Sequence, residues 1–183
     1  MKIGARTMPA SFRFIVIASI LLLAAPVAIE DDRPPVTVML AGFATEDIPN
    51  YQIASKIEQT IVEDLMRDEA LNVRSGVDHW GPFDTATAIL DPEPEYDAWG
   101  TPPLAYWRRH GAKALVTGKL TREGDGRLKI ESRLWDVAGG HYLSGQQYRV
   151  EPEHWRQIGH IIADTIYTRL TGRNGRFEAD NPE

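Results

Sequence analysis

The stretch ALVTGKLTREGDGRLKIESRLWDVAGGHYLSGQQYRV, residues 114–150, decides the fold. Through residues 127–134 apolar side chains alternate with charged ones, and this period of two is typical of a strand with one buried and one solvated face. Gly124-Asp125-Gly126 and Gly139-Gly140 are suited to tight turns, because glycine and aspartate tolerate positive φ. The stretch therefore predicts an antiparallel meander of three strands, at Ala114–Thr121, Arg127–Asp136 and His141–Val150.

The segments on either side of this meander predict helices and further strands. An apolar residue recurs every four positions from Ile53 to Leu65, which places these side chains on one face of an amphipathic helix. A second helical stripe follows Pro152 and ends at Gly172, two residues suited to a helix start and a helix end. The predicted elements are strands at Val36–Phe43 and Leu71–Arg74, and helices at Ile53–Met66, Leu104–His110 and Trp155–Gly172. Their order, β-α-β-α-β-β-β-α, predicts an α+β fold with a single mixed sheet and amphipathic helices packed mainly on one face.

The N-terminus has the layout of a secretory signal peptide. Basic residues Lys2, Arg6 and Arg13 precede an apolar run that extends to Ala28 and offers small residues for cleavage. We expect residues 1–28 to be removed on export. The alternative is an uncleaved leader that anchors the chain in the inner membrane, although the run is short of the ~20 residues that a spanning helix needs. The chain has no cysteine, which excludes a lipoprotein-type signal, disulfides and thiolate chemistry.

Charge limits the classes of partner. The leader holds three of the 20 basic residues and no acid, so the rest of the chain has 17 basic and 26 acidic residues and a formal net charge of −9. This balance argues against nucleic acid and anionic membrane surfaces as main partners, and it suits a basic protein surface. The membrane is expected to be reached only through a retained leader. Residues 29–35, which are acidic and end in two prolines, predict a flexible, extended lead-in to the first strand.

The polar residues form no recognisable active site. His154 and His160 are six residues apart on the final helix, a spacing that points them to different faces rather than to one metal ion. We expect these histidines, with His110 and His141, at the surface or its boundary. The acids Asp64, Asp68 and Glu69 are expected on a solvated helix face. The sequence therefore predicts no enzyme, no cofactor and no metal site.

One long irregular segment, Gly76–Pro103, interrupts the regular pattern. It is rich in proline, aspartate and glycine and contains several aromatic residues, including Trp80 and Trp99. Long loops inside compact domains are usually functional or packed on the surface. Because aromatic residues on loops often anchor interfaces, Trp80 and Trp99 form a candidate interface, and core filling under the loop is the alternative.

Several short motifs occur in the order and near the spacing of one known family. They are Tyr106-Trp107, Ala114-Leu115-Val116, Leu134-Trp135-Asp136-Val137, Gly145-Gln146-Gln147, Trp155-Arg156 and the run YTRLTG of Tyr167–Gly172. On these residues the chain resembles the TolB N-terminal domain family, part of the Tol-Pal system of the cell envelope. The resemblance is strong over Ala105–Phe177, weaker over Val36–Arg74, and not seen over Gly76–Thr101.

The resemblance implies an exported, periplasmic scaffold domain at residues 36–172, without enzymatic activity. In the family, the mature N-terminal segment ahead of the first strand engages the inner-membrane protein TolA. A β-propeller that follows the domain binds the lipoprotein Pal. Here a polar tail, residues 173–183, follows the last helix, so we expect no Pal binding from this chain alone. Carried over by position, the TolA-type site comprises Ile29, Glu30, Asp31, Asp32, Arg33, Pro34 and Pro35.

Two functional hypotheses follow. The first is a periplasmic protein-interaction domain linked to Tol-Pal cell-envelope integrity and to protein and bacteriocin import, with a TolA-like partner. The second is a stand-alone periplasmic accessory domain that binds another protein through the Gly76–Pro103 loop.

Overall fold

The computed structural model describes residues 34–45, 48–75, 100–175 and 177, all of which belong to one compact unit. Its elements follow the predicted order, with one turn of 3-10 helix before the last helix. They are β1 (Val36–Ala44), α1 (Ile48–Leu65), β2 (Leu71–Ser75), α3 (Leu104–Arg109), β3 (Ala114–Arg122), β4 (Leu128–Asp136), β5 (His141–Val150), η1 (Pro152–His154) and α4 (Trp155–Thr171). Helix α1 begins five residues earlier than predicted, because its first turn lacks the apolar repeat by which the sequence reveals a helix.

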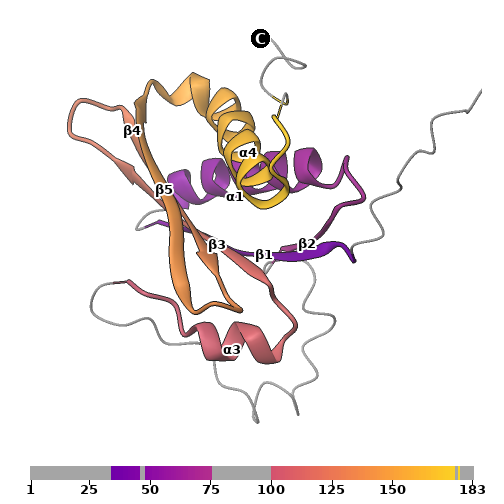
Figure 1. The fold of residues 1–183 in the computed structure, drawn as a ribbon. Coiled ribbons are helices and arrows are strands. Elements are labelled where there is room, and N and C mark those ends of the chain that lie inside the picture. The colour runs from indigo at the N-terminus through magenta and orange to yellow at the C-terminus, as the bar shows by residue number, and fades with distance from the viewer. Residues whose placement is uncertain (1–33, 46–47, 76–99, 176, 178–183) are drawn as a thin grey trace, which may run out of the picture. The chain divides into compact units, whose positions relative to one another are not determined.

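The five strands form one mixed sheet in the order β2-β1-β3-β4-β5 (Figure 1). Strand β1 lies between β2 and β3 and is parallel to both, with Val36 opposite Leu71 and Val38 opposite Ala114. Strands β3, β4 and β5 form the predicted antiparallel meander. The single mixed sheet of an α+β fold is therefore confirmed, and its two edges are the short β2 and the longer β5.

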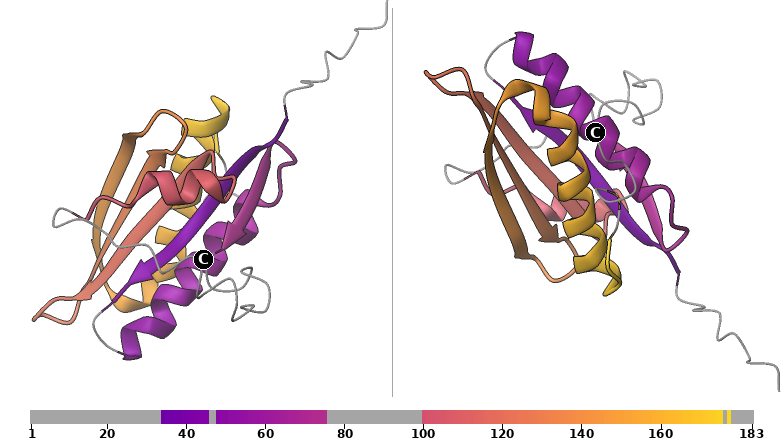
Figure 2. Two further views of the ribbon diagram at one scale, coloured as in Figure 1. Left: turned by 90° about the horizontal axis from the view of Figure 1, so that it is seen from below. Right: turned by 90° about the horizontal axis from the view of Figure 1, so that it is seen from above.

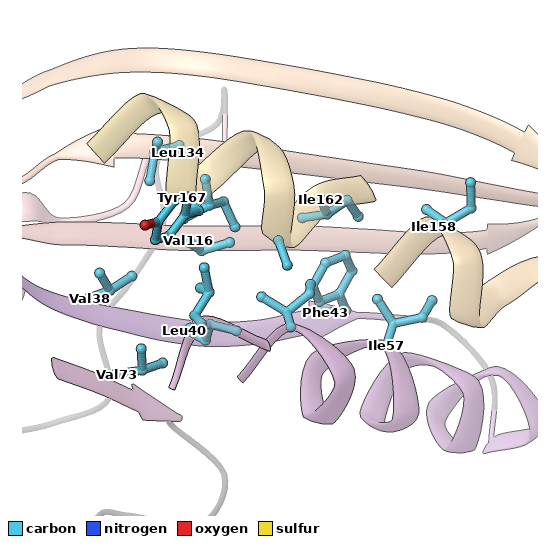
Figure 3. Packing of buried hydrophobic residues seen from close by; sticks show 14 of the residues in the cluster. Val38, Leu40, Phe43, Ile57, Val73, Val116, Leu134, Ile158, Ile162 and Tyr167 are labelled. Atoms are coloured by element: carbon cyan, nitrogen blue, oxygen red, sulfur yellow. The ribbon is translucent and has the colours of Figure 1, made fainter. Parts of the chain in front are cut away.

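Helices α1 and α4 pack side by side on one face of the sheet, which we call the helix-covered face (Figures 1 and 2). The apolar stripe of α1 meets that of α4 and the inward residues of the strands, and Figure 3 shows Ile57, Ile162 and Phe43 within this layer. Ile57, Ile61 and Ile162 are completely buried. Burial of each such side chain stabilises the fold by about 1.5–3 kcal/mol, so this layer is the principal core.

The other side of the sheet, the opposite face, carries α3 (Figure 2). Trp107 of α3 packs over Met39 and Leu115. Trp135 of β4 belongs to the same cluster, and its indole N–H donates a hydrogen bond to the Thr117 hydroxyl at 3.1 Å. The buried residues of this smaller cluster are Met39, Trp107, Ala112, Leu115, Trp135 and Val137. Two of the three described α-helices thus share one face, as predicted, and α3 covers part of the other.

A register shift near the end of β1 shapes the sheet locally. The pairing of β1 with β3 slips between Leu40 and Phe43, which is a β-bulge or a similar irregularity. Beyond it, the Phe43 ring lies against Gly118 of β3, where an added Cβ would be 2.3 Å from the ring. Only glycine leaves room for this ring, so the Gly118 position is explained by close packing.

The residues after α4 fold back onto it. The amide N–H of Phe177 donates to Asp164 Oδ1 at 2.7 Å, and the ring of Phe177 is buried, edge-on to Tyr167 at 5.6 Å between centroids. The polar composition of residues 173–183 gave no indication of this contact. Among the described residues, no helix is both long enough and apolar enough to cross a membrane.

Candidate interaction surfaces

The predicted N-terminal binding segment lies mostly outside the described residues. Of its seven residues, only Pro34 and Pro35 are described, and both are exposed immediately ahead of β1. The first ladder contact is made by the amide N–H of Val36, which donates to the Ala70 carbonyl at 2.9 Å. Because β2 and β3 begin level with β1, neither strand extends alongside the two prolines. The chain therefore enters the sheet at its interior strand.

Asp68 lies in the turn next to this entry. Its carboxylate accepts hydrogen bonds from the Tyr167 hydroxyl at 2.6 Å and from the Ala70 amide at 2.8 Å, and Arg173 lies 3.5 Å away. The Tyr167 hydrogen bond, followed by the Ala70 hydrogen bond, holds the pKa of Asp68 below its ordinary value. The expectation of a fully solvated helix face is thus wrong for Asp68, which is half-buried and links α4 to the turn after α1.

Asp64 and His160 require a larger correction. Both were expected in contact with solvent, and both are buried between α1 and α4, with His160 Nδ1 2.5 Å from Asp64 Oδ2. The exposed guanidinium of Arg67 lies 3.2 Å from the other carboxylate oxygen. The two helices approach closely here, since a Cβ at Gly159 would be 3.0 Å from Thr60. Closed off from solvent, the Asp64–His160 pair joins two helices and has no access to a substrate.

The remaining histidines are scattered. Nδ1 of His110 lies 2.9 Å from the Tyr106 carbonyl, His141 is exposed 4.0 Å from Asp136, and His154 is half-buried ahead of α4. Within the residues that the structure describes, no three histidine or acidic side chains are grouped so that they could hold a metal ion.

A cavity of about 620 Å³ opens beside the end of β1, between α1 and strands β3 and β4. Its wall includes Glu58 of α1, a buried carboxylate that accepts a 2.6 Å hydrogen bond from the Ser75 hydroxyl. Gly100 also lines it. Ser75 and Gly100 are the described residues on either side of segment 76–99, so the cavity adjoins both ends of that segment. The candidate interface residues Trp80 and Trp99 lie outside the described residues.

Sequence reasoning did not single out Glu58 as a buried carboxylate of this cavity wall. Glu58 follows Ile57 of the apolar stripe, and its helical position beside that stripe was the available signal.

Comparisons with known proteins agree with this architecture. A family model described as the TolB amino-terminal domain matches residues 29–143. The crystal structure of TolB from Acinetobacter baumannii superposes with a TM-score of 0.57 and 22% sequence identity, covering 79% of this chain and 30% of that chain. This chain thus spans about a third of that TolB structure, and at this identity the similarity concerns the fold alone.

Two smaller proteins resemble it more distantly. A PelC dodecamer from Paraburkholderia phytofirmans matches with a TM-score of 0.45 and 15% identity, over 77% of this chain and 91% of that one. Lipoprotein GNA1162 from Neisseria meningitidis matches with a TM-score of 0.45 and 13% identity, over 64% of this chain and 81% of that one.

Proposed function

The chain belongs to the TolB amino-terminal domain family, and on that premise we propose that it is a non-enzymatic protein-interaction domain of the Tol-Pal system in the periplasm. Residues 1–28 act as the export signal. The observation that carries the proposal is the family match itself, which begins at residue 29 and so includes the segment ahead of β1.

The proposed contact is made by residues 29–35, which bind a TolA-type partner. The segment carries three acids, Glu30, Asp31 and Asp32, suited to a basic surface on that partner. An extended segment can also add to the edge of a partner's sheet through its main chain. Pro34 and Pro35 have no amide hydrogen, so main-chain pairing would involve the residues before them. Both prolines are exposed ahead of β1, which supports a binding segment that lies outside the packed core.

Deletion of residues 29–35 tests the proposal. We expect the deletion to abolish capture of a TolA-type partner in a pull-down assay and to leave the melting temperature unchanged, because β1 and the core stay intact. The deleted segment carries a net charge of −2, so the double variant Glu151→Gln, Glu153→Gln is a control matched in charge. Both control residues are exposed just ahead of α4, and capture by this variant should equal that of the unmodified chain. Capture that survives the deletion would contradict the proposed site.

A second candidate function uses the Gly76–Pro103 loop to bind a different periplasmic protein. The cavity beside Glu58 favours it, because Gly100 of this loop lines the cavity and Glu58 accepts a hydrogen bond from Ser75, the residue just ahead of the loop. Alanine at Trp80 and Trp99 separates the two candidates. Loss of partner capture with unchanged stability would support the loop as the interface, whereas intact capture with several kcal/mol of lost stability would identify both residues as core.

A further inference from the structure

We propose that the cavity beside the end of β1 binds a short peptide, with the terminal ammonium group of the peptide at Glu58 and its terminal carboxylate at Arg133. This inference does not depend on the partner proposed above, because residues 29–35 precede β1 and the cavity lies at the other end of that strand. The cavity volume of about 620 Å³ is within the range of roughly 300–1,000 Å³ that small-ligand sites occupy. Its size therefore suits a ligand of a few residues.

The helix side of the cavity carries a buried negative charge. Glu58 of α1 is only 5% exposed, and its Oε1 accepts a hydrogen bond from the Ser75 hydroxyl at 2.6 Å. The two oxygens of a carboxylate together accept several hydrogen bonds, so an ammonium group can bind Glu58 in addition to Ser75. Hydrogen bonds between ionised groups are the strong ones, and shielding from water strengthens them further. This side of the cavity therefore favours a cationic group.

The sheet side of the cavity carries the opposite charge. Lys119 of β3 and exposed Arg133 of β4 line it together with Glu131. The Glu131 carboxylate already binds Lys129 at 3.1 Å, whereas among the described residues no acid lies within ion-pair distance of Arg133. The planar guanidinium group of arginine matches a carboxylate, to which it can donate two parallel hydrogen bonds. The two sides of the cavity thus suit a ligand with one positive and one negative end.

A stretch of strand edge lines the same cavity. Strand β2 pairs with β1 only as far as Leu40, which lies opposite Ser75. Among the described residues, no strand pairs with that side of β1 at residues 41–44, and all four of these residues line the cavity. Backbone groups at such an edge can bind an extended peptide through its main chain, and Phe43 and Ala54 add apolar surface for its side chains. Together with the two charges, this lining favours a peptide with free termini over a nucleotide or a fatty acid, because neither of these carries an ammonium group.

Calorimetric titration with the tetrapeptide Ala-Val-Ala-Val tests the two charge contacts. Its valines favour the extended conformation that the strand edge requires. We expect acetylation of its N-terminus and amidation of its C-terminus each to raise the dissociation constant about tenfold, because each change removes one charge-assisted contact. These comparisons use the unmodified chain, so they do not depend on the folding of a variant.

Two variants then assign each end of the peptide. Glu58→Gln keeps an acceptor for Ser75, and it should weaken binding of the free peptide about tenfold but binding of the acetylated peptide less than about twofold. Arg133→Gln should weaken binding of the free peptide and leave binding of the amidated peptide unchanged. Glu63→Gln, exposed on the same helix, and Arg122→Gln, exposed on β3, lie outside the cavity lining and are the matched controls. Circular dichroism verifies that each variant is folded.

Three results would overturn the proposal. The first is no measurable binding of the free peptide at millimolar concentration. The second is equal binding of the free, acetylated and amidated peptides, which would show that neither terminus is recognised. The third is an equal effect of Glu58→Gln and Glu63→Gln on the free peptide, which would place its ammonium group elsewhere. None of these results bears on capture of a TolA-type partner by residues 29–35, so the two proposals fail separately.

Discussion

The helix-covered face and the opposite face of the sheet are built from different kinds of residue. On the helix-covered face, 21 buried apolar residues from the strands, α1, α4 and Phe177 form one cluster. On the opposite face the described residues include six buried ones near α3, and farther along β3 and β4 they include exposed Lys119 and Arg133. We therefore expect most of the folding stability to come from the helix-covered face, and we expect part of the opposite face to tolerate substitutions.

The largest loss of stability is expected at the Asp64–His160 pair, which is buried on the helix-covered face. His160→Leu would leave the Asp64 carboxylate buried with only the exposed Arg67 nearby, and we expect a loss of about 3–4 kcal/mol in the free energy of unfolding. The double variant with Asp64→Leu removes the charge as well and should recover much of this loss. Urea denaturation of the single and double variants measures both values. A loss below about 1 kcal/mol for His160→Leu would show that water or another group reaches the pair.

A smaller effect is expected from Gly118→Ala. The added methyl group would meet the Phe43 ring, and forced repacking of this kind costs about 1–3 kcal/mol. The cost should fall in a Phe43→Leu background, because the smaller side chain vacates the space. Arg133→Ala is the control on the opposite face, expected to change stability by less than about 0.5 kcal/mol. An equal loss of stability in Gly118→Ala and Arg133→Ala would contradict the proposed difference in packing between the two faces of the sheet.

The smallest effect is expected at the margin of the helix-covered face and depends on pH. The pKa of Asp68 is lowered in the folded chain, so its ionised form stabilises the fold above the ordinary value of 3.8. This contribution is lost as the pH falls through the lowered pKa. Asp68→Asn should therefore reduce stability slightly at neutral pH and make the melting temperature less sensitive to acid below that value. Tyr167→Phe removes the main hydrogen bond and should reproduce part of the change, whereas an unaltered acid profile in both variants would exclude this contribution.

The sequence predicted the elements well because the elements depend on local patterns. The alternation through β4 and the four-residue repeat of α1 identified which residues would be inside. The placement of β1 between two parallel neighbours was beyond such patterns, because it depends on pairing with strands that are far away in the chain.

Asp64 and His160 show why the polar interior was missed. Asp64 lies three residues after Ile61 and next to Leu65, so its helical position belongs to the buried stripe even though its residue type suggests solvent. The partner that makes burial possible is 96 residues away. No local pattern in the sequence reports such a partner. The same reason applies to Phe177, whose ring contacts Arg67 in the turn after α1 and Tyr167 of α4.

The interior position of β1 has a mechanical consequence. A pull on the residues ahead of Val36 is delivered along the axis of β1, into the middle of the sheet. The hydrogen bonds to β2 and to β3 then share the load and are strained together in shear. A sideways pull on β5, which has one neighbour, would instead break its ladder bond by bond. A tether attached ahead of β1 therefore transmits tension to the strongest part of the domain.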